Sequence, residues 1–227
     1  MRKKHAYNRK SRFAEILLDW WKANKRDFPW RRKKDPYSIL IAEMLLRKTT
    51  AGQVEKVYIK FLSLYPDPIS LASADENELK ELLKPLGMEN RRAELLKRFG
   101  LHIKEKYSGR IPTKLDQLLE LPGVGMYAAN AVLSLCCSKD VPLLDTNFIR
   151  VIHRVFGIAS EKSRARCDRK LWEFAEKLIP PGNSKDFNLA VLDFAALVCK
   201  ARNPKCSECP VKAICRYYAS SPEELNS

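Results

Sequence analysis

Apolar residues recur three and four positions apart along most of the chain, which is the spacing of one face of an α-helix. The alternation of apolar and polar residues that marks β-strands is nearly absent. We therefore predict an all-α protein. Helices are expected over residues 11–24, 36–47, 51–65, 73–84, 91–107, 113–120, 126–138, 146–156, 171–179 and 188–198, with a turn at 66–68.

The segment 36–47 differs from the amphipathic helices because it is apolar on all sides, and a helix without a polar face is expected to be buried. Glu43 lies in its middle. A buried carboxylate is costly unless it is paired, hydrogen-bonded or protonated. Glu43 is therefore a candidate functional residue, and a salt bridge to a neighbouring arginine is an equally good interpretation.

A glycine-rich segment, Leu-Pro-Gly-Val-Gly at 121–125, separates two of the predicted helices. Gly123 and Gly125, on either side of Val124, permit a tight turn that leaves backbone N–H groups uncovered. The helix that follows adds partial positive charge at its N-terminus, so an anion such as a DNA phosphate fits there. A plain turn between two packed helices would have the same sequence.

Asp145 begins the helix predicted over 146–156, where a carboxylate is a favourable N-cap. The dipole of that helix is expected to keep the side chain ionised. A lone ionised carboxylate is also the group that stabilises a developing positive charge on a sugar. The sequence therefore leaves two interpretations of Asp145 open, a cap and a catalytic group.

Four of the seven cysteines crowd the C-terminal end in a C-x6-C-x2-C-x5-C pattern. Intracellular chains rarely keep such a group as disulfides. Four thiolates at this spacing suit an iron–sulfur cluster, and a structural zinc ion is the alternative. The predicted ligands are Cys199, Cys206, Cys209 and Cys215.

Charge narrows the class of partner. The formal net charge is +15, and residues 1–34 alone carry 13 Lys and Arg against three acidic residues. Such a surface attracts polyanions, most commonly nucleic acid, although a solvated basic tail would look the same. No apolar run is long enough to span a membrane, and no apolar core follows the basic N-terminus as in a signal peptide. We expect a cytoplasmic, nucleoid-associated protein.

Taken together, the hairpin at 121–125, Asp145 and the four cysteines resemble the helix-hairpin-helix (HhH-GPD) DNA glycosylase superfamily, in its endonuclease III-like branch. The resemblance implies a two-lobed fold with a six-helix barrel over 28–140. The second lobe would join 1–27 to 141–227 and hold a [4Fe-4S] cluster at 199–215. Double-stranded DNA would lie between the lobes with the target base flipped out.

Tyr127 distinguishes the candidates within this branch. Endonuclease III-type enzymes have a lysine there that forms a Schiff base and cleaves the strand, and tyrosine has no amine. Adenine mismatch glycosylases usually have serine there and a C-terminal domain that reads oxidised guanine, whereas this sequence ends 12 residues after Cys215. The best resemblance is to the thymine–DNA mismatch glycosylases, through residues 45–52, Tyr127, 145–148 and 186–189.

That resemblance implies a monomeric, monofunctional enzyme that removes thymine or uracil opposite guanine without strong lyase activity. Asp145 would stabilise the oxocarbenium-like sugar and orient water, Glu43 would hydrogen-bond the flipped base, and Tyr127 would line the pocket. Two alternatives stay open: an adenine mismatch glycosylase that lacks the C-terminal domain, and a non-catalytic DNA-binding iron–sulfur protein.

The same resemblance assigns residues that would contact DNA. Met88 matches the position at which the superfamily inserts an apolar wedge into the base stack. Arg47 and Lys48 would fill the gap left by the flipped base and contact the widowed guanine. The N–H groups of Gly123, Val124 and Gly125 would hold phosphates.

Overall fold

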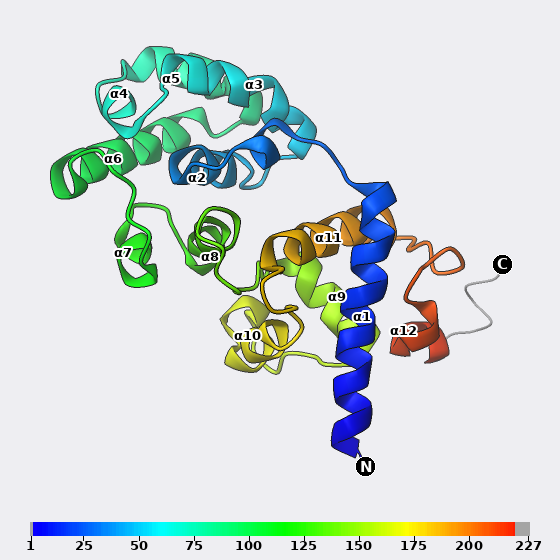
Figure 1. Ribbon diagram of the computed structural model, residues 1–227. Coiled ribbons are helices and arrows are strands. Elements are labelled where there is room, and N and C mark those ends of the chain that lie inside the picture. The colour runs from blue at the N-terminus through cyan, green and yellow to red at the C-terminus, as the bar shows by residue number, and fades with distance from the viewer. Residues whose placement is uncertain (1, 221–227) are drawn as a thin grey trace. The chain divides into compact units, whose positions relative to one another are not determined.

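A computed structural model of the protein describes residues 2–220, and side chains from residue 9 onward (Figure 1). The described residues form helices and no β-strand, so the prediction of an all-α fold is confirmed. The α-helices are α1 (Arg2–Asn24), α2 (Pro36–Leu45), α3 (Ala51–Leu64), α4 (Pro68–Ala72), α5 (Glu76–Leu83), α6 (Glu89–Tyr107), α7 (Leu115–Glu120), α8 (Met126–Leu135), α9 (Thr146–Phe156), α10 (Arg169–Glu176), α11 (Ser184–Leu197) and α12 (Arg216–Ser220). Short 3-10 helices are η1 (Pro29–Arg32), η2 (Lys84–Leu86), η3 (Ala165–Cys167) and η4 (Lys212–Ile214).

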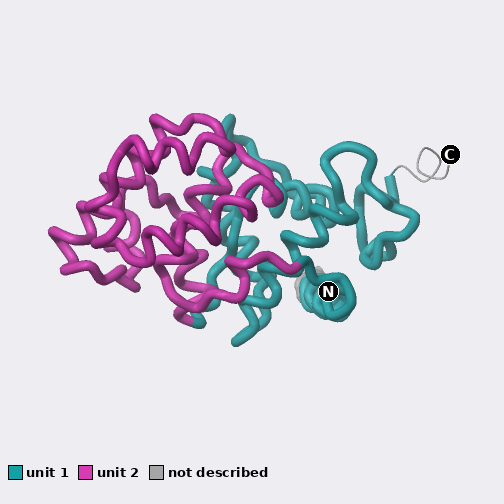
Figure 2. The backbone as a smooth tube through the Cα atoms, turned by 90° about the horizontal axis from the view of Figure 1, so that it is seen from above, with its two compact units in different colours: residues 1–26, 138–227 teal, residues 27–137 magenta. Residues whose placement is uncertain are grey.

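The chain divides into two compact units (Figure 2). Unit 1 contains residues 1–26 and 138–227, and unit 2 contains residues 27–137. These boundaries lie close to the expected 1–27, 141–227 and 28–140. Unit 2 holds seven α-helices, α2 to α8, where the sequence led us to expect six.

The additional helix is α4, which begins at Pro68, the last residue of the turn expected at 66–68, and ends before the helix expected over 73–84. Asp67 caps it, because its side chain accepts hydrogen bonds from the backbone N–H groups of Ile69 and Ser70, both at 2.8 Å. Pro68 then occupies the first helical position, where its missing N–H costs nothing. α4 packs closely on α6 at Gly100, where an added Cβ would lie 2.8 Å from the backbone nitrogen of Ala72.

Other helix boundaries also differ from the prediction. α1 begins at Arg2 instead of residue 11, in a polar segment that has no apolar periodicity to reveal it. The helix expected from residue 113 begins at Leu115, and its N-cap residue, Lys114, makes no side-chain hydrogen bond to the helix. Within the described residues, no helix is both long and apolar enough to cross a membrane.

Unit 2 is built around α2, which packs against α3 and α8. Most of α2 is buried, and Tyr58 of α3 reaches its first turn by donating from its hydroxyl to the carbonyl of Ser38 at 3.0 Å. The expectation of a fully buried helix is wrong at Glu43, which is half-buried. Its carboxylate is therefore partly accessible to water, which reduces the desolvation cost that a core position would impose.

Unit 1 joins the N-terminal helix to the C-terminal half of the sequence. α1 packs against α11, and the ring of Phe13 meets that of Phe187 edge to face at 6.2 Å between centroids. Asp193 of α11 is fully buried and accepts a hydrogen bond from Nε1 of Trp21 at 2.8 Å. Arg26 forms an ion pair with the same carboxylate, which compensates the burial of its charge.

Candidate functional site

The hairpin between α7 and α8 has the backbone that its two glycines predicted. Gly123 adopts a φ of 78°, in the left-handed region that favours glycine, and the N–H of Val124 donates to the carbonyl of Leu121 at 3.0 Å. The N–H groups of Gly123 and Gly125 donate no hydrogen bond to another described residue. Gly125 is exposed and directly precedes α8, so a helix N-terminus with uncovered donors is presented to solvent.

Tyr127 and Glu43 lie on two helices that pack against each other, α8 and α2. Both side chains are half-buried. Partial burial lowers the pKa of the Arg47 guanidinium below its ordinary value, and the nearby carboxylate of Glu43, one turn earlier, partly opposes this shift. Arg47 in turn donates a hydrogen bond to the carbonyl of Gly123. Glu43, Arg47 and the hairpin therefore belong to one connected region of unit 2.

Lys48 and Met88 share an uncommon backbone conformation. Their φ angles are 54° and 55°, in the left-handed region that side-chain-bearing residues rarely adopt. Met88 is the N-cap of α6, and its side chain is 40% exposed, which is high for a large apolar residue. Strained backbone of this kind is concentrated at functional sites.

Asp145 is the N-cap of α9, which agrees with the first of its two interpretations, a helix cap. Its Oδ1 accepts from the backbone N–H groups of Asn147 and Phe148, at 2.9 and 2.8 Å. These bonds lower its pKa, but burial outweighs them and raises the pKa above the ordinary value. Burial, which the sequence did not reveal, therefore opposes the effect of the helix N-terminus, and ionisation of Asp145 at neutral pH stays a prediction. The capping role leaves the catalytic interpretation intact.

A chain of hydrogen bonds leads from Asp145 to the cysteine-rich loop. Oδ2 of Asp145 accepts from the side-chain amide of Asn147 at 2.6 Å, and Oδ1 of Asn147 accepts from Arg150 at 3.0 Å. Arg150 also donates to the carbonyls of Cys199 and Ala195, both at 2.9 Å. The carboxylate is thus oriented by residues that are themselves anchored at the start of the cysteine loop.

No role for Asn147 or Arg150 was predicted from the sequence. Their spacing of three residues places them on one helix face. That spacing was the available signal, but nothing in it revealed that the backbone carbonyl of Cys199 would lie within reach.

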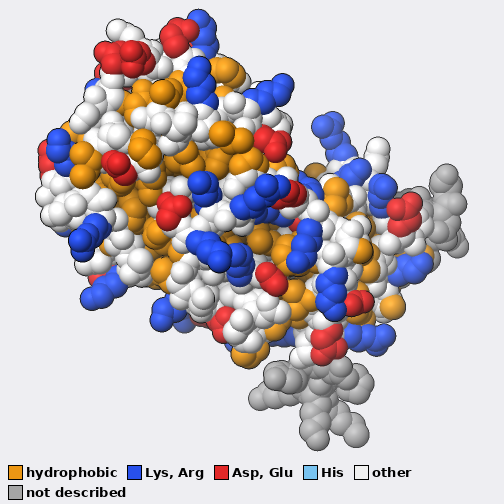
Figure 3. Space-filling view, turned by 45° about the horizontal axis from the view of Figure 1, so that its top comes forward, with side chains coloured by type: hydrophobic (Ala, Val, Ile, Leu, Met, Phe, Trp, Pro, Cys, Tyr) orange, Lys and Arg blue, Asp and Glu red, His pale blue; other side chains and the backbone are white. Residues whose placement is uncertain are grey.

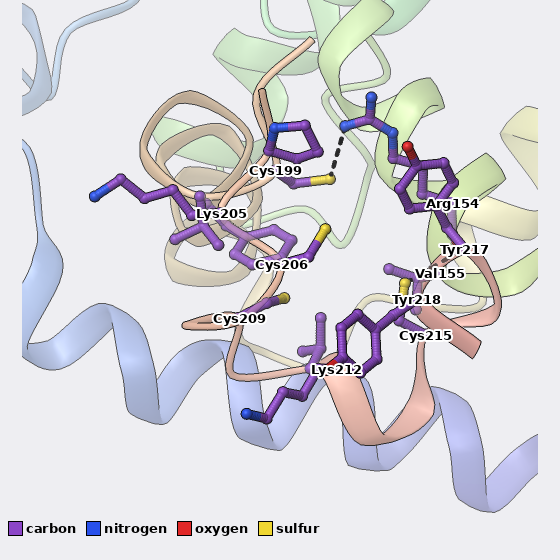
Figure 4. A pocket seen from close by; sticks show the side chains of 14 residues that line it. Arg154, Val155, Cys199, Lys205, Cys206, Cys209, Lys212, Cys215, Tyr217 and Tyr218 are labelled. Atoms are coloured by element: carbon purple, nitrogen blue, oxygen red, sulfur yellow. Dashed lines mark hydrogen bonds between the residues drawn. The ribbon is translucent and has the colours of Figure 1, made fainter. Parts of the chain in front are cut away.

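The four predicted metal ligands gather around one opening of about 330 Å³, part of which is open to solvent (Figure 4). Their sulfur atoms point toward this shared space, and all four thiols are free of disulfides. Cys199, Cys209 and Cys215 are buried and Cys206 is half-buried. Burial raises the pKa of the Cys209 thiol to about 12, so binding of a metal at this position would release a proton.

The donor set fits an iron–sulfur cluster. Soft thiolates are its usual ligands, and a cubane holds its four ligands farther apart than one ion does. Among the described side chains, residues 9–220, no three His, Cys, Asp or Glu side chains are close enough together to hold a single metal ion. A guanidinium nitrogen of Arg154 lies 3.6 Å from Sγ of Cys199, where it would compensate the charge of a thiolate. Lys205 and Lys212 extend away from the sulfur atoms (Figure 4).

With this geometry in place, comparison with known proteins identifies the class. Residues 41–177 match the family model of HhH-GPD superfamily base excision DNA repair proteins, and residues 199–215 match the iron–sulfur binding domain of endonuclease III. The chain therefore belongs to the HhH-GPD superfamily, which confirms the resemblance found in the sequence. The match also confirms the predicted [4Fe-4S] cofactor.

Particular relatives are similar over nearly the whole chain. A thymine/uracil-DNA glycosylase of Pyrobaculum aerophilum is 48% identical, over 92% of each chain. A thymine-DNA glycosylase of Aeropyrum pernix is also 48% identical, over 89% of this chain and 92% of its own. The solved structure of a thermostable thymine-DNA glycosylase superimposes with a TM-score of 0.89 at 41% identity, covering 94% of this chain and 98% of the other.

The cluster makes a direct prediction. Protein purified anaerobically should be brown, absorb broadly in the visible region and contain about four iron atoms per chain, because thiolate-ligated iron gives charge-transfer absorption. Iron and acid-labile sulfide assays would measure the content. Replacement of Cys206 by serine should lower both iron and sulfide, whereas Cys167→Ser, at an exposed cysteine outside the cluster loop, should leave them unchanged. One zinc and no iron would contradict the assignment.

Positive charge extends beyond the candidate site. Figure 3 shows Lys and Arg side chains spread across the face in view, with Asp and Glu side chains among them. The basic side chains of residues 2–4, which contribute to the N-terminal excess, lie outside the described side chains. On this face the basic side chains are dispersed and not gathered in one patch.

This charge predicts a steep salt dependence of binding to undamaged duplex DNA, because each phosphate contact releases condensed counterions. For roughly 5–8 contacts, the slope of log K against log salt concentration should be about −4.5 to −7. Fluorescence anisotropy across a salt series would measure it. A slope near zero would mean that the basic residues do not touch the DNA backbone.

Proposed function

We propose that the protein is a DNA glycosylase that releases thymine or uracil from G·T and G·U pairs in double-stranded DNA and leaves the sugar–phosphate strand intact. The observation that carries this proposal is the 48% identity to a thymine/uracil-DNA glycosylase over 92% of both chains. Tyr127, which has no amine, supports hydrolysis without strand cleavage.

The chemistry proposed for Asp145 follows from its surroundings. As the pyrimidine leaves, positive charge develops on the sugar, and an oriented carboxylate stabilises it and directs the attacking water. Asn147 and two backbone N–H groups hold the carboxylate in one orientation, so little reorganisation is needed when the charge appears. Burial strengthens the interaction because it removes competing water.

Glu43 and Tyr127 are proposed to act on the flipped base. Both side chains are half-buried, which leaves each of them partly accessible to a ligand. The Glu43 carboxylate would hydrogen-bond the base or its leaving-group carbonyl, and the Tyr127 ring would line the pocket.

The remaining assigned residues are proposed to contact duplex DNA. Met88 would enter the base stack, Arg47 and Lys48 would fill the space opposite it, and the hairpin at 121–125 would hold a phosphate. We further propose that one monomer binds one mismatch and that its charge keeps it on chromosomal DNA in the cytoplasm.

A panel of duplexes tests the proposed substrate. Single-turnover reactions should generate alkali-labile sites at the mismatched thymine and uracil of G·T and G·U duplexes. Duplexes with adenine opposite 8-oxoguanine, with thymine glycol and with a normal A·T pair serve as comparisons. Efficient release of adenine together with inert G·T and G·U duplexes would replace the proposal with an adenine mismatch glycosylase. Binding without release from any duplex would indicate a non-catalytic protein.

A further inference from the structure

Arg92 of α6 is a buried arginine with an unusual set of partners. It is 7% exposed. Its guanidinium donates to four backbone carbonyls: Nε to Gly87 at 2.8 Å, Nη1 to Met44 at 3.1 Å and Leu45 at 3.2 Å, and Nη2 to Arg47 at 2.6 Å. A buried cation held by carbonyl dipoles in this way fixes the backbone segments that supply them.

The four carbonyls belong to the neighbourhoods of two turns that are about 40 residues apart in sequence. One is the Lys48 turn, residues 44–50, at the C-terminal end of α2. The other is the Met88 turn, residues 84–89, which leads into α6. Each contains one non-glycine residue in the left-handed region, Lys48 at a φ of 54° and Met88 at 55°. Such conformations persist only where the surrounding structure holds them in place.

Helix capping alone accounts for part of this arrangement. The last carbonyls of α2 have no partner within the helix, and a cation at a helix C-terminus is favourable. Capping does not account for the bond to Gly87, because that carbonyl belongs to the other turn. A guanidinium can hold both turns at once because its N–H donors point in several fixed directions within one plane. The single ammonium of a lysine cannot reach all four carbonyls.

The hairpin is attached to the same assembly. Arg47, whose carbonyl accepts from Arg92, donates through its own guanidinium to the carbonyl of Gly123. Arg92 therefore connects the Met88 turn to the Lys48 turn, and Arg47 connects the Lys48 turn to the hairpin at 121–125. All three segments belong to unit 2.

We propose that Arg92 is a positioning residue that fixes the Lys48 turn and the Met88 turn relative to each other, so that both enter the base stack of a DNA duplex together. Arg92 does not touch DNA itself. The DNA-penetrating role of the two turns rests on the proposed function, but their relative positioning by Arg92 does not depend on which base is released.

The test begins with Arg92→Lys, which keeps the charge and loses the fork. Hydrogen exchange of the DNA-free protein should become faster at amides of both turns, residues 44–50 and 84–89, and remain unchanged in α3 and α11. Arg98→Ala is the matched control, because it removes an arginine from an exposed position on the same helix, where the pair with Glu94 spans 3.9 Å. Unchanged exchange in both turns of Arg92→Lys would overturn the proposal.

The functional consequence is measured on the same variant. A 2-aminopurine placed beside a G·T mismatch should report less unstacking, and single-turnover base release should fall by on the order of 10- to 100-fold, the scale for misplacement by about 1 Å. Affinity for undamaged duplex should stay near wild type, since the charge is retained. Wild-type unstacking with Arg92→Lys would contradict the proposal.

A double-mutant cycle with Met88→Ala separates positioning from general damage. If Arg92 acts through the Met88 turn, unstacking by the double variant should be close to that of Met88→Ala alone. Independent, multiplicative losses would overturn the proposal. If the wild-type protein releases neither thymine nor uracil, the proposed function fails, and the exchange and fluorescence results still decide the role of Arg92.

Discussion

Asp145→Asn should bind a G·T duplex at least as tightly as the wild type and lose on the order of 10²-fold or more in single-turnover base release. The asparagine oxygen can still accept the two backbone hydrogen bonds that cap α9, so the helix is retained. The change removes the negative charge, which is what stabilises the oxocarbenium-like sugar, and also the Oδ2 acceptor of the Asn147 side-chain amide. The expected loss is the scale for one preorganised electrostatic group.

Because the pKa of Asp145 is raised, the rate of base release and the folding stability should depend on pH in opposite directions. Base release requires the carboxylate, so the rate should fall as pH drops through a value above 3.8, the ordinary value for this group. Folding, in contrast, favours the neutral form, so the ionised group contributes unfavourably at neutral pH and this cost is relieved as pH falls. Asp145→Asn should therefore melt no lower than the wild type at pH 7. A variant that releases thymine at the parent rate would reduce Asp145 to a helix cap.

Tyr127→Lys should acquire covalent trapping that the wild-type protein lacks. A lysine amine whose pKa is lowered by burial can attack C1′ of the flipped sugar as the base leaves with the electrons of the glycosidic bond. The C1′–ring-oxygen bond then opens to give an imine, which borohydride reduces to a stable protein–DNA link. The position is half-buried on the first turn of α8, which suits such a shift. With the wild-type protein, the strand should break only after hot alkali. With the variant, some breakage should precede alkali treatment.

Tyr127→Phe is the matched control, because it keeps the ring and adds no amine, and it should give no trapped complex. Trapping by the wild-type protein would point to another amine, such as the N-terminus. If Tyr127→Lys releases the base and forms no trapped complex, the side chain does not face the sugar and serves only in packing.

The periodicity of apolar residues was sufficient to predict most of the helices, because the apolar face of a helix must be buried whichever element packs against it. It did not locate their ends. α7 begins at Leu115, two residues later than predicted, and α1 extends through a polar segment. Helix ends depend on a few local hydrogen bonds, and several residues near an end can supply them.

The candidate site was predictable where the chemistry resides in side-chain type and spacing. The four thiols and the glycine hairpin are of this kind, since few other residues could replace them. Arg92 and Arg150 escaped prediction because their partners are mostly backbone carbonyls brought near by folding. A carbonyl is present at every residue, so the sequence carries no mark of which one an arginine will reach.

Free thymine released from a defined mismatch is the most direct measure of the proposed activity. A duplex that carries one G·T pair, with an isotopic label in that thymine, is incubated with excess protein and the free base is quantified by mass spectrometry. The proposed function predicts one thymine per abasic site from G·T, none from the same label in an A·T pair, and an intact strand before alkali. No free thymine from G·T, or equal release from both pairs, would contradict it.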